Sequence, residues 1–183
     1  DVNSFQLIEL IKKGNKGISF SGKSLREKTD FSVAAAFNPN VANLKKAVQR
    51  LERKISSGAD YILTQPVYST EKIIEIKKET AIFDIPIFLG IMPVTTSRNA
   101  EFLHNEVPGI KLTDEVRERM RKVAGDKAQS TAESIAISKD LIDTALEHFN
   151  GIYLITPFMR YDITIELVEY IREKTKVLEK VAY

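Results

Sequence analysis

The sequence of 183 residues has no cysteine, no tryptophan and two histidines, His104 and His148. Without cysteine the chain can form neither a disulfide nor a reactive thiolate, which is compatible with a reducing compartment. Two lone histidines do not match the ligand spacing of a zinc site, so we expect no metal. We expect His104 to be exposed. His148 falls at the C-terminal end of a predicted helix, where the dipole favours it, and we expect a structural role.

Several other features are missing. No apolar run approaches the roughly 20 residues that a membrane span needs. No secretory signal opens the chain, and no glycine-rich nucleotide or phosphate loop is present. The formal net charge is only +2, and basic residues alternate with acidic ones. We therefore expect a cytoplasmic protein with neither a membrane nor a nucleic-acid partner.

What the sequence does contain is a repeated pattern of short apolar runs, each closed by a polar residue or a proline. These runs, which predict strands, occupy residues 31–37, 61–65, 85–92 and 151–156. Helical periodicity predicts helices over residues 4–12, 41–55, 70–76, 113–120 and 134–149, and a last one from Thr164. Strands separated by helices predict right-handed β-α-β units and a parallel α/β sheet. With 43% hydrophobic residues, we expect one domain over residues 1–183.

Helix starts can also be predicted. Thr70 and Thr113 have the side chains expected of N-caps, and either Thr96 or Ser97 caps the helix after the third strand. That helix then has Asn99 in its first turn. Residues 14–30 form the one long connection and are expected to be a surface loop.

Neutral polar groups and one cation stand at or just beyond the predicted strand ends. They are Asn38, Thr64, Gln65, Thr95, Thr96, Asn99, Thr156 and Arg160. In parallel α/β folds ligands bind at this edge. Such a set suits a heteroaromatic ligand with amide-like edges and an anionic tail. The alternative is that each residue closes a turn, caps a helix or forms a surface ion pair. That alternative suits Asn38, which precedes a proline, better than it suits Gln65.

Four motifs, in order along the chain, resemble the methylenetetrahydrofolate reductase family. They are Ala34-Ala35-Ala36-Phe37-Asn38-Pro39, Ala59-Asp60-Tyr61-Ile62-Leu63-Thr64-Gln65, Gly90-Ile91-Met92-Pro93-Val94 and Thr156-Pro157-Phe158-Met159-Arg160. The likeness is nearest to the reductase part of bacterial homocysteine S-methyltransferase/reductase proteins. It implies a (β/α)8 TIM barrel, of which this chain covers about the C-terminal half. It also implies FAD, reduced by NAD(P)H, and conversion of 5,10-methylenetetrahydrofolate to 5-methyltetrahydrofolate.

The resemblance implies substrate contacts for three residues. Gln65 is similar to the family glutamine that binds the pterin and lies near the nicotinamide. Asn99 stands where the family often has a glutamine, which gives it a shorter reach. Arg160 resembles the arginine that meets the glutamate end of the folate.

Cofactor contacts are implied for three others. Arg53 and Lys54 resemble the basic pair at the FAD phosphates, and Phe37 replaces a tyrosine that contacts the flavin in many members. The usual histidine a few residues later is absent from residues 40–43. This departure weakens the expectation of FAD contacts in that segment.

The family's acidic proton donor and its flavin-binding aspartate would precede Asp1, so we expect no catalytic residue within this chain. We expect an N-terminal barrel half, and possibly a homocysteine methyltransferase domain, to complete the enzyme. The isolated chain should be inactive, free of flavin and self-associating through its open sheet edges. The alternative is a non-catalytic barrel half that binds folate or supports a methyltransferase. An unrelated phosphate-binding barrel is disfavoured because residues 90–99 contain little glycine.

Overall fold

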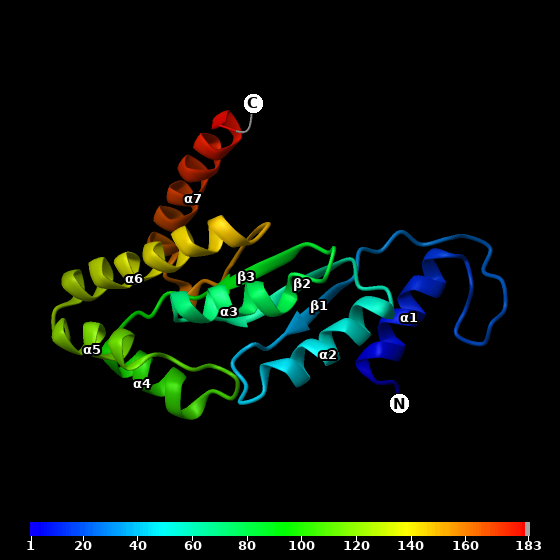
Figure 1. Cartoon of the computed structure of the whole chain (residues 1–183), viewed down its shortest axis with the longest axis horizontal. Helices are drawn as coiled ribbons and strands as arrows, with labels where there is room; N and C mark the ends of the chain where they lie inside the picture. The colour runs from blue at the N-terminus through cyan, green and yellow to red at the C-terminus, as the bar shows by residue number, and fades with distance from the viewer. Residues whose placement is uncertain (182–183) are drawn as a thin grey trace.

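The protein is a sheet of four parallel strands in the order β1-β2-β3-β4, covered by helices (Figure 1). A computed structural model describes the backbone of residues 1–181 and the side chains of residues 1–176. The strands are β1 (Ala34–Phe37), β2 (Tyr61–Pro66), β3 (Ile87–Ile91) and β4 (Gly151–Leu154). The predicted parallel α/β class is confirmed.

Helices connect successive strands and flank them at both ends of the chain. They are α1 (Ser4–Asn15), α2 (Leu44–Ser56), α3 (Thr70–Thr80), α4 (Ser97–Glu106), α5 (Asp114–Lys122), α6 (Lys127–His148) and α7 (Tyr161–Val181), with a short 3-10 turn η1 (Pro157–Met159) before α7. No helix within the described residues is both long and apolar enough to cross a membrane.

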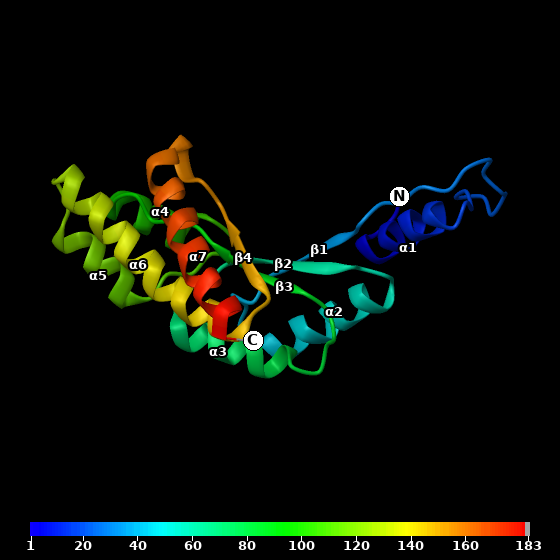
Figure 2. The same ribbon diagram turned by 90° about the horizontal axis from the view of Figure 1, so that it is seen from above.

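The two faces of the sheet have different surroundings. Figure 2 shows α2 and α3 on one face, where the side chains of Ile62, Leu89 and Ile91 are at most 1% exposed. The other face carries Ala34 and Ala36, both exposed. Parallel sheets are normally covered on both faces. This one-sided sheet is consistent with part of a (β/α)8 barrel, whose interior the bare face would line.

Several predicted helix starts are confirmed, whereas α2 begins at Leu44, with Asn43 as its N-cap, instead of at residue 41. Thr96 and Thr113 cap α4 and α5 as expected. Ser69, rather than Thr70, caps α3 by accepting a hydrogen bond from the Lys72 N–H at 3.1 Å. The last helix begins at Tyr161, three residues before the predicted Thr164.

Helix α6 begins seven residues earlier than the predicted residue 134. The Asp126 carboxylate accepts a hydrogen bond from the Gln129 N–H at 2.9 Å and so caps the helix. The missed first turns contain small residues such as Ala128 and Ser130 and no large apolar side chain. They pack by close approach, because Ser130 is buried and its hydroxyl donates to the Val123 carbonyl. Hydrophobic periodicity cannot detect such a segment.

Helix α1 is attached through Lys12 to Asp60, the residue that precedes β2. It extends to Asn15, three residues beyond the predicted end. Lys12 forms an ion pair with Asp60 at 2.6 Å, and the same carboxylate accepts the Val33 N–H at 2.7 Å. The Lys12 ammonium, which donates a hydrogen bond, is the main reason that the pKa of Asp60 is lowered. The segment after α1 is largely exposed, as expected of a surface loop.

Candidate functional site

Gln65 lies where β2 ends, in an open pocket of about 330 Å³. Asn38, Arg50, Lys54 and the wall residue Ala36 line the same pocket. No side-chain hydrogen bond of Gln65 occurs within the described residues, and its side chain is exposed. Among the described lining residues none is a carboxylate. The pocket therefore presents one free carboxamide beside two cations.

The two cations, Arg50 and Lys54, come from successive turns of α2. Arg50 and Lys54 line the pocket, and Arg53 is not among its lining residues. The guanidinium of Arg53 lies 4.2 Å from the centre of the Phe5 ring on α1, and that of Arg50 lies 5.8 Å from the same centre. Lys54 donates a hydrogen bond to the Ala36 carbonyl. Burial, followed by the nearby charge of Arg50, lowers the pKa of Lys54. The negative charge of an anionic ligand would favour the charged form of Lys54 and so oppose this lowering.

Phe37 contributes to this region from the sheet's covered side. Phe37 is only 3% exposed and belongs to the core between β1 and the helices. The preceding Ala36 carries the exposed face of β1. Phe37 therefore supports the pocket wall and has little surface to offer a ligand.

Asn38 is a turn residue, as the alternative interpretation proposed. Its side-chain oxygen accepts the Asn40 N–H at 2.9 Å. The Asn40 carboxamide in turn donates to the carbonyls of Pro66 and Gly109 at 2.8 and 2.9 Å. The sequence analysis did not identify this role of Asn40. It connects the end of β1 to the end of β2 and to the loop after α4.

Asn99 is 8% exposed and uses its carboxamide oxygen locally. The oxygen accepts the Thr95 N–H at 3.1 Å, while the Asn99 N–H donates to the Thr96 cap at 3.0 Å. Asn99 does not line the pocket that contains Gln65. The structure thus gives this residue a role at the start of α4.

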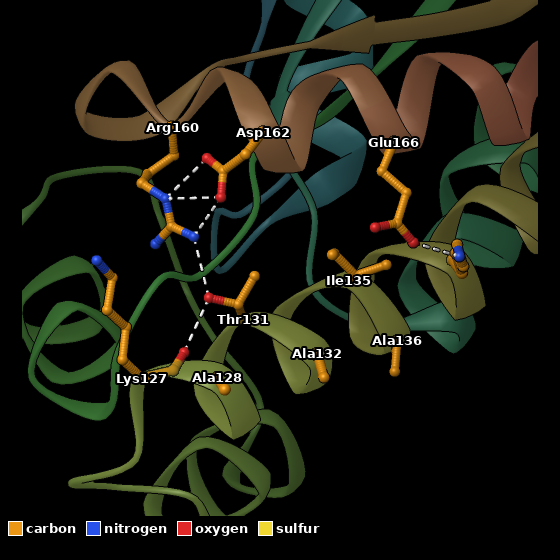
Figure 3. A pocket seen from close by; sticks show the side chains of 10 residues that line it. Lys127, Ala128, Thr131, Ala132, Ile135, Ala136, Arg160, Asp162 and Glu166 are labelled. Atoms are coloured by element: carbon orange, nitrogen blue, oxygen red, sulfur yellow. Dashed lines mark hydrogen bonds and ion pairs between the residues drawn. The ribbon is translucent and has the colours of Figure 1, made fainter.

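Arg160 follows two residues with positive φ, Phe158 at 46° and Met159 at 56°. Non-glycine residues rarely adopt this conformation, and it often occurs at functional sites. The guanidinium forms a two-pronged ion pair with Asp162, at 2.9 Å from Nε and 2.7 Å from Nη2, and donates to the Thr131 hydroxyl at 3.0 Å (Figure 3). The Arg160 hydrogen bond lowers the pKa of Asp162 to about 2.

Arg160 also lies between two adjoining hollows. One, of about 790 Å³, runs between α6 and α7, and Lys127 and Glu166 lie along it (Figure 3). The other, of about 460 Å³, is formed by the start of α4 and the α5–α6 turn, and Arg98 lines it. The side chains of Arg98 and Lys127 form no ion pair within the described residues. Arg98 and Lys127 are therefore the cations available to an anion here. Carboxylates also line the hollows: Asp162 and Glu166 the first, and Asp126 the second.

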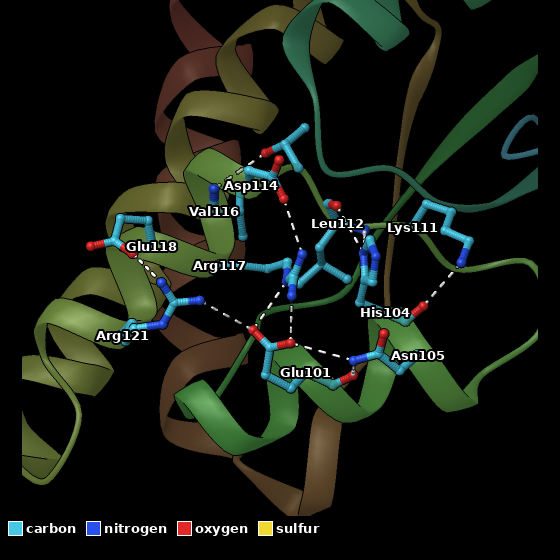
Figure 4. A network of polar contacts seen from close by, with 11 residues as sticks. Glu101, His104, Asn105, Lys111, Leu112, Asp114, Val116, Arg117, Glu118 and Arg121 are labelled. Carbon is cyan, nitrogen blue, oxygen red and sulfur yellow. Dashed lines mark hydrogen bonds and ion pairs between the residues drawn. The ribbon is translucent and has the colours of Figure 1, made fainter.

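A network of polar contacts joins α4 to α5 (Figure 4). Glu101 pairs with Arg117 at 2.6 Å and lies 3.7 Å from Arg121. His104 is half-buried rather than exposed, and its Nδ1 lies 3.0 Å from the Leu112 carbonyl. The network and the histidine join two helices and do not line either hollow near Arg160.

Comparison with known proteins identifies the family. A family model described as methylenetetrahydrofolate reductase matches residues 3–172. The chain belongs to this family. A solved structure described as an uncharacterized protein from Clostridium thermocellum that binds two copies of 5-methyl-5,6,7,8-tetrahydrofolic acid matches with a TM-score of 0.56 and 18% sequence identity. The match covers 79% of this chain and 54% of that one, so this chain spans about half the length of the solved relative.

Membership in the methylenetetrahydrofolate reductase family indicates the fold in which the site lies. The family fold is a TIM barrel, and the four parallel strands are consistent with a fragment of one. Gln65, Lys54 and Arg160 line hollows near the carboxyl ends of the strands. Arg53 lies against Phe5, and Arg50 lines the same pocket as Lys54.

Proposed function

We propose that this chain binds a reduced folate at the carboxyl end of its sheet. As part of a longer enzyme, it would serve the reduction of 5,10-methylenetetrahydrofolate to 5-methyltetrahydrofolate by NAD(P)H and FAD. The observation that carries the proposal is the free Gln65 carboxamide beside a cationic pocket in a chain of this family. The Clostridium relative, described as binding 5-methyltetrahydrofolate, supports folate as the ligand class.

The proposed substrate contacts follow from the chemistry of a folate. Its pterin ring has adjacent donors and acceptors, which a carboxamide can match with two hydrogen bonds. Gln65 is proposed to bind this edge. The glutamate end of the folate carries carboxylates, for which a guanidinium is a strong hydrogen-bonding partner. Arg160 is proposed to bind there by exchanging its contact with the Asp162 carboxylate for one with the ligand, while Arg98 and Lys127 add positive charge. Asn99 remains a weaker candidate because its oxygen already accepts the Thr95 N–H.

The residues of the Gln65 pocket also suit one part of FAD. Arg50 and Lys54 are one turn apart on α2, a spacing that brings two cations to one anionic group. They would hold the FAD phosphates, while Phe37 would support the wall rather than touch the ring system. FAD, when bound, supplies the hydride transfer. No described lining residue of this pocket is a carboxylate, so the proton donor is proposed to come from outside the pocket.

Calorimetric titration with 5-methyltetrahydrofolate tests the folate proposal. Gln65→Ala should weaken binding roughly tenfold, because an unmatched buried hydrogen-bonding group costs about 1–3 kcal/mol. Gln49→Ala is the matched control, since Gln49 is an exposed amide of α2 outside the pocket. Equal affinities for the two variants would refute the role of Gln65.

Quenching of flavin fluorescence tests the cofactor contacts in the same chain. FAD binding should be weaker in Lys54→Ala and Arg50→Ala than in the unaltered chain. It should be unchanged in Arg53→Ala, which removes the nearer of the two arginine contacts with Phe5 and so controls for the loss of that contact in Arg50→Ala. The opposite order would restore Arg53 as the phosphate ligand.

The second candidate function is a folate-binding half without its own catalysis, which the absence of a carboxylate from the described pocket lining favours. NAD(P)H oxidation in the presence of added FAD separates the two functions. Folate binding without oxidation would assign this chain the binding role alone. Oxidation at enzyme-like rates would show that the reacting groups are all within residues 1–183.

A further inference from the structure

The strand that ends at Gln65 contains an irregularity. Leu63 pairs with Phe88 and Pro66 pairs with Gly90, so β2 advances three residues where β3 advances two. One extra residue on one strand is a β-bulge, and bulges commonly occur next to functional sites. The bulge spans Thr64 and Gln65, so it governs the backbone that carries the proposed folate-binding amide.

A side chain holds the bulge closed. The Gly90 N–H donates to the Thr64 hydroxyl at 2.8 Å, and that hydroxyl donates to the Gln65 carbonyl at 2.9 Å. Pro66 has no N–H, and the Gly90 carbonyl instead accepts the Val67 N–H at 3.1 Å. Thr64 is only 3% exposed, so water cannot readily replace its hydroxyl.

Gly90 provides the space for this arrangement. A Cβ atom at residue 90 would lie 2.6 Å from the Thr64 carbonyl oxygen and 3.1 Å from the Gln65 carbonyl carbon. Both are backbone atoms, which cannot move aside as a flexible side chain can. The close approach of β3 to the bulge therefore requires glycine, and it brings the Gly90 N–H within reach of the hydroxyl.

We propose that Thr64 is a positioning residue, whose hydroxyl fixes the bulge and thereby the direction of the Gln65 carboxamide. The consequence for ligand binding rests on the proposed folate function. Valine has nearly the same shape as threonine but neither donates nor accepts, so Thr64→Val leaves the buried Gly90 N–H and the Gln65 carbonyl without this partner. The backbone at Gln65 is then free to move, and small displacements of a recognition group weaken binding.

Titration with 5-methyltetrahydrofolate is the first test. Thr64→Val should weaken binding roughly 5- to 10-fold, and Thr64→Ser, which keeps the hydroxyl, should restore most of the affinity. Thr80→Val is the matched control. Thr80 is also 3% exposed, and its hydroxyl donates to the Ile76 carbonyl at the end of α3. If Thr64 acts through Gln65, Thr64→Val should add no loss to Gln65→Ala.

Two results would overturn the proposal. One is equal binding by Thr64→Val and Thr80→Val, and the other is additive loss in the double variant. A second measurement does not depend on folate: amide hydrogen exchange at Gly90 and the NMR signals of the Gln65 side-chain amide. Thr64→Val should speed exchange and shift these signals, while Thr64→Ser and Thr80→Val should not.

The two proposals can fail separately. If the unaltered chain does not bind 5-methyltetrahydrofolate, the proposed function is wrong, and the NMR measurement alone decides the positioning role. Unchanged Gly90 exchange and unchanged Gln65 signals in Thr64→Val would refute that role in either case.

Discussion

The glycine at the β2–β3 contact provides a sharp test of the packing around the bulge. Gly90→Ala would place a methyl group 2.6 Å from the Thr64 carbonyl oxygen, closer than real Cβ atoms come. Overpacking of this kind costs about 1–3 kcal/mol. Replacing glycine in a strand recovers about 0.5–1 kcal/mol through a less flexible unfolded chain. We expect a net loss of about 1–2 kcal/mol, which for a chain of this size lowers Tm by about 3–6 °C.

Urea and thermal denaturation measure this effect, and Gly14→Ala is the contrasting control. Gly14 lies in α1, and its added Cβ would meet only the Thr29 hydroxyl, at 3.1 Å. That exposed hydroxyl donates to the Asn15 side chain at 2.7 Å, and shifting it offsets part of the helix propensity that alanine adds. Gly14→Ala should therefore change stability by less than about 0.5 kcal/mol. Equal stability of Gly90→Ala and the unaltered chain would refute the claim that residue 90 must be glycine.

Three further perturbations test individual contacts. Asn99→Ala should lower the free energy of unfolding in urea by about 1–2 kcal/mol, because the buried Thr95 N–H loses its acceptor; weaker folate binding without lost stability would instead favour substrate contact. The pKa of Asp162 is lowered to about 2 from 3.8, so its contribution to stability is present above about pH 4 and is lost as pH falls toward 2. An NMR titration should find that low pKa, and Arg160→Gln should return it toward the usual value. Tyr68→Phe should lower the free energy of unfolding by about 1 kcal/mol in the same urea assay, because it removes the hydrogen bond of 2.8 Å that the Tyr68 hydroxyl donates to the Met92 carbonyl. An unchanged unfolding midpoint would contradict this contribution.

The sequence by itself determined the class of the fold and the order of its elements. Short apolar runs such as Tyr61-Ile62-Leu63 are local signals that predicted the strands, although β2 continues through Pro66, which pairs with Gly90. Capping is equally local, because a side chain at Thr96 or Thr113 reaches backbone only three residues away. The sequence also predicted that polar groups would meet at the carboxyl ends of the strands, since parallel strands share that edge.

Only the tertiary structure decided which of these groups face a ligand. Arg50, Arg53 and Lys54 have the same chemistry in the sequence, and their roles depend on how α2 is turned about its axis. Arg53 lies against Phe5, from a helix near the start of the chain, while Arg50 lies farther from that ring and also lines the pocket with Lys54. No pattern within α2 contains that information.

The same reason explains the bulge and the buried amide. The hydroxyl of Thr64 accepts a hydrogen bond from the N–H of Gly90, 26 positions away, and the pattern of residues along β2 cannot reveal this contact. The family resemblance implies substrate contact for Asn99, and the sequence could not show that its oxygen accepts the Thr95 N–H once the loop before α4 has folded. Local signals determine which elements form, because they act over a few residues. Contacts between elements determine which polar groups remain free, and these contacts exist only after the chain has packed.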